Sequence, residues 1–239
     1  MENIELMNND YVPAQEEQTL KVLIAVESSV DDKKYAVDKE TYIENKADYT
    51  VNGIAFIDET KKIYEIMSLD VRELIFLENG KPTIPDSDES VVDVVNPTVN
   101  EYNGKFLTDL HIMFAKDGEY DSPNCAIGYC KSYKDGSWWL GNIAEVELIR
   151  NNIESVSELI SVINSNILAT YTEGMYWTSN NWSDDYTWSI DFSDDKMRYW
   201  KSRTEAMNVV PFNSAKGYEI IEKENEEIEN TEENGNVEE

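Results

Sequence analysis

Residues 176 to 202, YWTSNNWSDDYTWSIDFSDDKMRYWKS, place four of the six tryptophans of this chain among Asn, Ser, Asp and Tyr. From Thr187 to Phe192 small polar residues alternate with bulky apolar ones, and this period of two indicates a half-buried β-strand. Turn residues 193 to 195 lead to a second expected strand at 197 to 199, and a third is expected near 208 to 212. The stretch predicts buried strands that carry an aromatic recognition surface. The alternative, in which every tryptophan is framework, stays open.

Two further β-rich regions precede this stretch. The apolar run Leu20 to Val26 predicts one strand, and the runs 50 to 57 and 62 to 69 flank a short acidic turn as in a β-hairpin. Residues 78 to 105 carry three of the six prolines. That segment is predicted to be an irregular connection with at most one short strand near Val91 to Val95.

Helical patterns occupy the middle of the chain. Ser122, Pro123 and Gly136 suit the N-cap, the first turn and the C-terminal end of a short helix. From about Asn142 to Asn164 apolar residues recur every three or four positions, which predicts one longer amphipathic helix. A strand and a hairpin, followed by two helices and several antiparallel strands, indicate an α+β fold rather than a parallel α/β fold.

The chain is strongly acidic. Its 239 residues include 20 Lys and Arg against 49 Asp and Glu, for a net charge of -29. Such a field repels phosphate groups, so neither nucleic acid nor an anionic membrane is expected as a partner. Residues 219 to 239 contain ten Glu and one Lys with few apolar residues. We therefore predict that residues 218 to 239 form a disordered acidic tail.

Signals for export and membrane insertion are not found in the sequence. No apolar run approaches the roughly 20 residues of a membrane-spanning helix, and the N-terminus lacks the pattern of a signal peptide. Cys125 and Cys130, five residues apart in a predicted helix, would lie on different helical faces, which disfavours a disulfide. We expect no membrane insertion, and synthesis and assembly in a reducing cytoplasm.

Patterns typical of catalysis are weak. His111 is the only histidine and lies in the apolar run DLHIMF, which favours a structural role. Neither cysteine has a nearby histidine or cation cluster, and no nucleophile elbow or phosphate loop occurs in the sequence. We predict a non-enzymatic protein without cofactor or metal. The open alternative is a calcium site in the Asp-rich loops, although turn aspartates usually bond their own backbone. Its candidate ligands are Asp184, Asp185, Asp191, Asp194 and Asp195.

Five segments between about residues 49 and 212 resemble, in order, elements of a C-type-lectin-like domain of the DUF1566 and fibrobacter-succinogenes-major-domain type. GIAFIDETKKIYEIMSL is similar to the opening hairpin, and NGKFLTDLHIM with SPNCAIGYCKSY to the lead-in and first helix. DGSWWLGNIAEVELI, YWTSNNWSDDYTWSIDF and YWKSRTEAMNVVPF resemble three later elements. The matching positions there are Trp138, Leu140, Glu147, Leu148, Trp177, Ser179, Trp188, Phe192, Lys201, Val209 and Pro211. Gly141 and Val210 depart from the family's usual Pro and Arg.

The resemblance implies a C-type-lectin-like fold over residues 46 to 217, with two helices packed on antiparallel strands. Residues 1 to 45 would form an N-terminal β-containing segment for anchoring and oligomerisation. The implied framework residues are Trp177, Trp188, Ile190 and Phe192. The implied ligand-binding residues are Asn180, Asn181, Trp182, Asp184, Asp185, Tyr186, Tyr199, Trp200 and Arg203.

The resemblance also implies binding rather than catalysis. With no cysteine after Cys130, the formylglycine-generating activity of one branch is not expected. We expect a bacteriophage virion surface protein, such as a head fibre, capsid decoration protein or tail-associated adhesin of the kind found in crAss-like phages. It would bind other virion proteins through residues 1 to 45 and a host surface glycan or protein through its C-terminal face. A homo-oligomer is expected, with a trimer among the options. The alternatives are a purely structural virion component and a bacterial surface lectin.

Overall fold

The computed structural model describes residues 19–77, 102–114, 123–164, 166, 173–181, 185–193 and 198–223. The described strands are β1 (Lys21–Ser28), β2 (Lys34–Val37), β3 (Tyr49–Asp58), β4 (Ile63–Met67), β5 (Arg72–Ile75), β6 (Trp139–Leu140), β7 (Met175–Asn181), β8 (Tyr186–Asp191), β9 (Arg198–Ser202), β10 (Ala206–Val209), β11 (Pro211–Ser214) and β12 (Glu219–Ile221). The described helices are α1 (Lys39–Asn45), the 3-10 helix η1 (Lys46–Asp48), α3 (Gly104–Phe114), α4 (Ala126–Ser132), α5 (Ile143–Asn151) and α6 (Ile153–Asn164).

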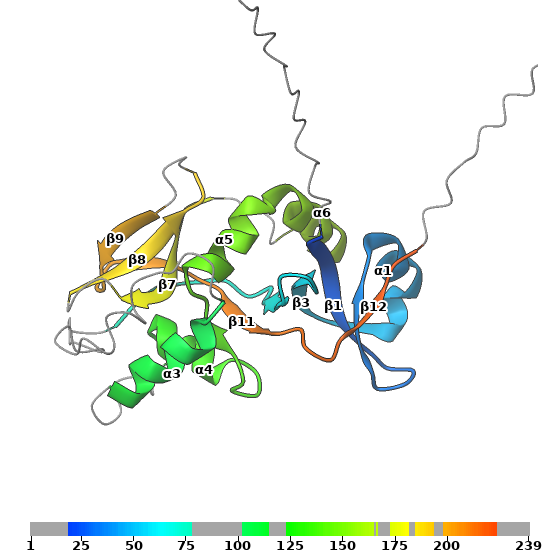
Figure 1. The fold of residues 1–239 in the computed structure, drawn as a ribbon, viewed down its shortest axis with the longest axis horizontal. Helices are drawn as coiled ribbons and strands as arrows, with labels where there is room; N and C mark the ends of the chain where they lie inside the picture. The colour runs from blue at the N-terminus through cyan, green and yellow to red at the C-terminus, as the bar shows by residue number, and fades with distance from the viewer. Residues whose placement is uncertain are drawn as a thin grey trace, which may run out of the picture.

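The strands form two mixed sheets. The larger sheet has seven strands in the order β12-β2-β1-β3-β4-β11-β6, and the smaller has five in the order β5-β10-β7-β8-β9. Figure 1 shows the smaller sheet with α3 and α4 towards one end of an elongated molecule. The strands β1 and β12 lie with α1 towards the other end, and α5 and α6 lie between the two ends (Figure 1).

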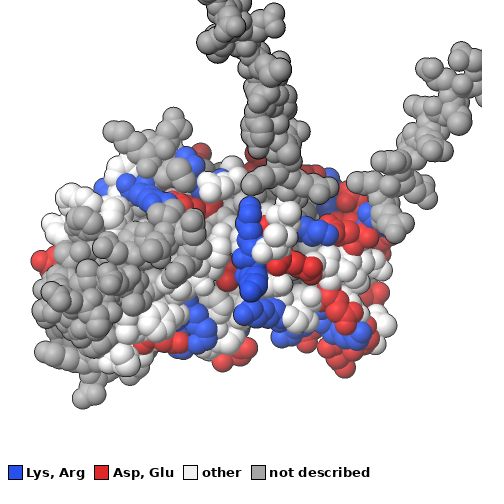
Figure 2. All heavy atoms as spheres, viewed as in Figure 1, with Lys and Arg blue, Asp and Glu red and all other residues white. Residues whose placement is uncertain are grey.

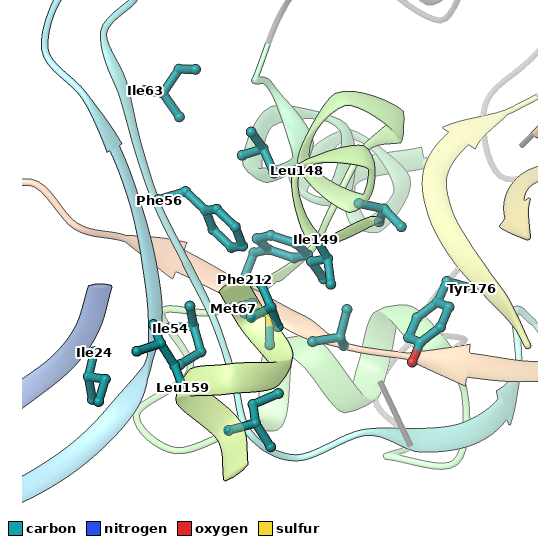
Figure 3. Close-up of a cluster of buried hydrophobic side chains, with 14 of the residues drawn as sticks. Ile24, Ile54, Phe56, Ile63, Met67, Leu148, Ile149, Leu159, Tyr176 and Phe212 are labelled. Atoms are coloured by element: carbon teal, nitrogen blue, oxygen red, sulfur yellow. The ribbon is translucent and has the colours of Figure 1, made fainter. Parts of the chain in front are cut away.

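This architecture contradicts the predicted α+β, C-type-lectin-like fold. The fold is mainly β, and α5 packs between two sheets instead of on one. A single core cluster contains Phe56 of β3, Ile149 of α5 and Tyr176 of β7. In Figure 3, Phe56 and Tyr176 approach α5 from opposite sides. Both sheets therefore depend on the same helix for the burial of an apolar face.

One short segment shows why the sequence pattern predicted strands correctly but predicted the wrong fold. Residues 208 to 212 were expected to form one strand, but β10 ends at Val209 and β11 begins at Pro211. Before Val210 the chain pairs with β5 and β7 in the smaller sheet, and after it with β4 and β6 in the larger one. Period-two alternation predicts strands but does not specify which strands pair.

The N-terminal strand and hairpin are confirmed. β1 includes most of the predicted apolar run, and β3 and β4 pair in register from Ile54↔Met67 to Asp58↔Ile63. In the turn between β3 and β4, the side chain of Asp58 accepts a hydrogen bond from the backbone N–H of Lys61 at 2.9 Å.

The predicted division of the chain into an anchor, a domain and a tail does not follow the sheets. β1 pairs antiparallel with β2 on one side and with β3 on the other, so a boundary at residues 45 and 46 would cut through one sheet. β12 pairs parallel with β2, although it lies in the segment predicted to be a disordered tail. The rest of that predicted tail, from residue 224, and the predicted strand at 91 to 95 lie outside the described residues.

The helices are predicted in part. α4 lies within the expected short helix, and its two cysteines, Cys125 at the N-cap and Cys130, are buried and not joined in a disulfide. The expected long helix is instead two helices that meet at Asn152, whose φ of -120° leaves the helical region. The side-chain N–H of Asn152 donates to the carbonyl of Leu148 at 2.8 Å, and the backbone carbonyl of Asn152 accepts from the N–H of Val156 at 2.9 Å. It thereby ends α5 and begins α6.

Trp177 is the largest fully buried side chain of the smaller sheet. It has no exposed surface, and its Nε1 donates to the carbonyl of Leu74 at 3.0 Å. Its ring meets that of Phe76 edge to face, with 5.6 Å between ring centroids. Trp188, also expected to be framework, is only partly buried at the margin of the core. Among the tryptophans that the structure describes, the most buried is the one on β7, between β10 and β8.

We predict that Trp177→Ala lowers the free energy of unfolding by about 3–5 kcal/mol, because it leaves a cavity and an unpaired carbonyl. Trp200→Ala serves as the control, since its side chain is 53% exposed, and should cost less than about 1 kcal/mol. Denaturant unfolding of both variants measures the difference. Equal losses would contradict the assignment of Trp177 to the core and Trp200 to the surface.

Candidate aromatic recognition site

β8 and β9 form the outer part of the smaller sheet. They pair antiparallel, with Trp188 directly opposite Trp200 and Tyr186 opposite Ser202. Side chains alternate between the two faces of a strand, so Tyr186, Trp188 and Trp200 lie on the same face. The inner end of this face, at Ile190, packs into the core beside α5. The outer end extends beyond the helix towards solvent.

Two aromatic rings meet at that outer end. Tyr186 is 37% exposed and Trp200 is 53% exposed. Their ring centroids lie 5.1 Å apart with an interplanar angle of 90°, which is an edge-to-face contact. We call Tyr186 and Trp200 the aromatic pair. Because Trp188 lies opposite Trp200 and packs against the core, the pair continues a row of aromatic residues from the interior to the surface.

An ion pair holds β9 against α5. The guanidinium of Arg198 donates from Nε and Nη2 to the two carboxylate oxygens of Glu147, at 2.5 and 2.9 Å. A two-point contact of this kind fixes orientation as well as distance. Glu147 is buried and Arg198 partly exposed. The aromatic pair therefore lies on a strand whose position is fixed by the hydrophobic core and by this ion pair.

Three of the predicted ligand-binding residues have structural roles instead. Asn180 is buried and its side-chain oxygen accepts from the N–H of Ile143 at 2.7 Å, at the first turn of α5. Arg203 is completely buried, and its guanidinium donates to the side-chain oxygens of Asn181 and, at 3.2 Å, of Thr187. These residues hold β7 and β8 to their neighbours, so none of the three is available to an external ligand.

The remaining predicted residues are divided between the two faces and the loops. Asp185 is exposed next to Tyr186, and its backbone carbonyl accepts from the N–H of Arg203 at 3.1 Å. Tyr199 is partly buried and lies on the opposite face from Trp200. Trp182 and Asp184 lie outside the described residues. Of the nine predicted positions, the structure brings together Tyr186 and Trp200, with Asp185 alongside.

His111 has the structural environment predicted for it. The ring is completely buried in α3, and its Nε2 lies 2.8 Å from the carbonyl oxygen of Ser179. Burial lowers the pKa of His111 to about 3, so the imidazole is neutral at physiological pH. The ring also meets Phe76 edge to face at 5.3 Å. A neutral, enclosed imidazole cannot exchange protons with an external substrate.

Two buried glutamates were missed by the sequence analysis. Glu145 is 1% exposed, and its carboxylate accepts from the N–H of Asn142 at 2.7 Å, the N–H of Gly104 at 3.2 Å and Nε1 of Trp139 at 3.3 Å. Asn142 in turn caps α5 by accepting from the N–H of Glu145 at 2.9 Å. The spacing Asn-x-x-Glu before an apolar helical run is a signal that could have identified this capping box.

Glu65 is the other buried glutamate that the sequence pattern did not indicate. It lies on β4 with 9% of its surface exposed, and no described residue donates a hydrogen bond to its Oε2. Burial, with a contribution from the charge of Glu145, strongly raises the pKa of Glu65. Burial raises the pKa of Glu145 as well, although its three N–H donors act against this. We therefore assign the negative charge to Glu145 and a proton to Glu65.

Paired carboxyl groups can act as acid and base, but these two are enclosed in the core. Glu145 is committed to three donors on α3, β6 and α5, and both side chains are almost completely removed from solvent. A general acid or base must come within hydrogen-bond reach of its substrate. The pair therefore belongs to the architecture of the fold and not to an active site.

A concave surface lies on the larger sheet. It has a volume of about 650 Å³ and is lined by Thr19, Lys21, Ile57, Glu59, Thr60, Ile220 and Glu222. Lys21 and Glu222 form an ion pair across it, between β1 and the end of β12. On the face seen in Figure 2, acidic and basic side chains are interspersed over this half of the molecule. No single charge dominates there, so this concavity has no charge selectivity comparable to a phosphate or metal site.

Over the parts of the chain that the structure describes, no group of three or more His, Cys, Asp or Glu side chains could hold a metal ion. Asp191, one of the proposed calcium ligands, accepts from the N–H and hydroxyl of Ser193 at 2.9 and 2.6 Å, as turn aspartates do. Asp194 and Asp195 lie outside the described residues. None of the described helices is long and apolar enough to cross a membrane.

Comparisons with known proteins give one distant structural similarity. No protein-family model matches the chain, and no curated protein matches it. A crystal structure of a fimbrial protein from Bacteroides ovatus ATCC 8483 aligns with a TM-score of 0.39 and 14% sequence identity. The alignment covers 85% of this chain but 45% of the fimbrial protein, so the chain spans less than half of its length. A similarity at this level does not define a shared fold.

We predict that stability falls as the pH rises above the ordinary glutamate pKa, 4.5, because folded Glu65 keeps a proton that Glu65 of the unfolded chain releases. Folding raises the pKa of Glu65, so its stabilising contribution is present at low pH and is lost as the pH rises. Glu65→Gln keeps the shape without the titration, so it should flatten this dependence and be more stable than the unchanged protein at alkaline pH. Denaturant unfolding from mildly acidic to alkaline buffers, with the exposed Glu59→Gln as control, measures this. A Glu65→Gln profile parallel to that of the unchanged protein would contradict the assignment.

Proposed function

We propose that this protein is a non-enzymatic binding protein whose aromatic pair recognises a glycan on a surface. The observation that carries the proposal is the exposed edge-to-face contact of Tyr186 and Trp200 on β8 and β9. Large aromatic side chains are costly to leave in water, and exposed Tyr and Trp residues are typical of recognition surfaces. The enclosed states of His111, Glu65 and Glu145 support binding rather than catalysis.

The fixed position of the strands that carry the aromatic pair favours this proposal. Tyr and Trp have few rotatable bonds, so they lose little side-chain entropy when a ligand binds. Here the strands are also fixed by the contact of Arg198 with Glu147 and by the packing of Trp188 against the core. A preorganised aromatic surface loses less free energy to ordering on binding than a mobile loop does.

The charge of the protein narrows the class of glycan. With a net charge of -29, the chain repels anionic ligands over a distance set by the salt concentration. Sugar rings present apolar C–H faces that stack on aromatic rings without requiring a charge. We therefore propose a neutral glycan rather than a sulfated or sialylated one.

We propose that Trp200→Ala abolishes most of this binding while the protein stays folded. Loss of a central aromatic contact typically costs 2 kcal/mol or more of binding free energy, or roughly a 30-fold weaker Kd. The matched control is Phe106→Ala on α3, because the side chain of Phe106 is also 53% exposed. Binding to an array of neutral and acidic glycans and to host cells gives the readout. Unchanged binding in the Trp200 variant, or an equal loss in both variants, would overturn the proposal.

For the biological setting we propose the surface of a phage virion. This rests on the resemblance of sequence segments between residues 49 and 212, and the mainly β, two-sheet fold removes the lectin-fold part of that argument. Mass spectrometry of purified particles, with antibody labelling of intact particles, tests it. Detection on the particle surface supports an adhesin, detection only inside disrupted particles supports a purely structural component, and detection on the bacterial surface supports a bacterial adhesin.

A further inference from the structure

Residues 215 to 223 cross the face of the larger sheet that points away from α5. β11 lies beside β4 and β12 beside β2, so the connection between them passes β3 and β1, as Figure 1 shows. We call residues 215 to 223 the C-terminal strap. Three strap residues, Ala215, Tyr218 and Ile220, pack on this face. The buried residues that they contact as one cluster are Leu23, Ala25, Ala36, Ala55, Ile57, Ile66 and Trp138.

The two ends of the strap are held differently. At its start, Ala215 is 1% exposed and its N–H donates to the carbonyl of Tyr64 at 2.9 Å. From Glu219 to Lys223 no residue is buried, and β12 is the one described strand of the larger sheet without a buried residue. Only its three residues pair with β2. Burial of apolar surface therefore contributes little to the attachment of the far end.

Ion pairs join the far end of the strap to the rest of the protein. They connect it to the start of β1, to the turn before β2 and to α1. The pairs are Lys21 with Glu222, Lys33 with Glu219 at 3.0 Å, and Lys223 with Glu44. All six side chains are more than a third exposed. Exposed ion pairs are individually weak and are screened by salt, so this attachment depends on ionic strength.

Gly217 separates the two ends. Its φ is +88°, in the region that glycine adopts without strain, and nothing lies within 4 Å of the position that a Cβ would take. The residues before it are fixed to β4 through Ala215 and Tyr64. The chain can therefore change direction at Gly217 without disturbing β11.

We propose that residues 219 to 223 detach from the larger sheet as a unit, with Gly217 as the hinge, and that ionic strength sets the attached fraction. Detachment leaves β2 paired with β1 through four residue pairs. Below the strap this part of the sheet presents Ala25 and Ala36, whose small side chains expose little apolar surface when they are uncovered. Local opening of this kind needs much less free energy than global unfolding.

Detachment would change the concave surface of the larger sheet. The strap contributes Ile220 and Glu222 to its lining, and the start of β1 and the turn between β3 and β4 contribute the rest. Without the strap this concavity loses one wall, Lys21 loses its carboxylate partner, and the edge of β2 opens to an extended segment. The inference does not depend on the proposed glycan site, because the aromatic pair lies on the smaller sheet.

Salt should act on the strap and on the whole fold with opposite signs. The chain has a net charge of -29, and repulsion among its acidic groups opposes the compact state. Screening this repulsion favours folding, whereas screening the three ion pairs of the strap favours detachment. A loss of protection at the strap without a loss of global stability therefore distinguishes local detachment from unfolding.

Residue-resolved hydrogen exchange of the full-length protein, at about 0.01 M and about 1 M NaCl, tests the proposal. The reporters are the N–H of Asp38, which donates to the carbonyl of Ile221 at 3.2 Å, and the N–H of Lys223, which donates to the Asp38 carboxylate at 2.6 Å. We expect high salt to speed their exchange roughly tenfold relative to the amides of β3 and β4, because three weak pairs are screened together. The denaturant midpoint should not fall. Exchange as slow as that of β3 and β4, or unchanged by salt, would overturn the proposal.

Removal of the cations tests the role of the ion pairs. The double variant Lys21→Gln and Lys33→Gln should speed exchange of both reporters at low salt and reduce the further effect of high salt. The matched control is Lys105→Gln, which removes an exposed ion pair with Asp109 on α3 and should leave the reporters unchanged. Equal exchange in the double variant and the control would contradict the proposal.

A covalent tether tests the detachment itself. Ala36 and Ile220 lie directly opposite each other on β2 and β12, so Ala36→Cys with Ile220→Cys places two thiols across the strand pair. The oxidised variant should lose the salt response of both reporters, and reduction of the same sample should restore it. A salt response that persists in the oxidised variant would mean that exchange does not proceed through detachment of the strap.

Discussion

The arrangement of both sheets depends on the hydrogen bonds that the carboxylate of Glu145 accepts. It accepts hydrogen bonds from α3 through Gly104, from β6 through Trp139 and from the start of α5 through Asn142. α5 in turn supplies apolar side chains to both sheets, so the carboxylate that fixes its N-terminus also fixes their separation. Gly104 is required at this point, since a Cβ there would lie 2.0 Å from an oxygen of Glu145. Acceptors of N–H groups at a helix N-terminus also gain from the helix dipole.

Glu65 makes this arrangement conditional on pH. A buried carboxyl group that has no donor to one oxygen favours its neutral form, and the neighbouring charge of Glu145 strengthens that preference. Ionising both groups would place two negative charges between β4 and the α5 N-terminus in a region that excludes water. Ionisation of Glu65 at high pH would therefore create an unfavourable charge pair at the point where the larger sheet meets the helices. Lys216 is the cation that partly offsets it.

Local pattern predicted the elements of this fold better than their assembly. The alternation from Thr187 to Phe192 correctly indicates β8, and the expected hairpin is present as β3 and β4. Partners far apart in the sequence could not be predicted in the same way, because a strand's period is the same in any sheet. The switch of sheets at Val210 and the break of the helix at Asn152 each involve one residue in an otherwise regular pattern. The candidate site shows the same limit. Arginine is usually found at the surface, but Arg203 is completely buried.

The position of a strand within its sheet decides which tryptophan is framework and which is surface. Trp177 lies on β7, between β10 and β8, and residues on both sides cover it. Trp188 lies one strand further out and is partly buried, and Trp200, on the edge strand, is more than half exposed. The exposure of the tryptophan side chain therefore increases from the centre of the sheet to its edge. A strand at the edge of a sheet has a neighbour on one side only, so a tryptophan at its centre is covered less than one on an inner strand.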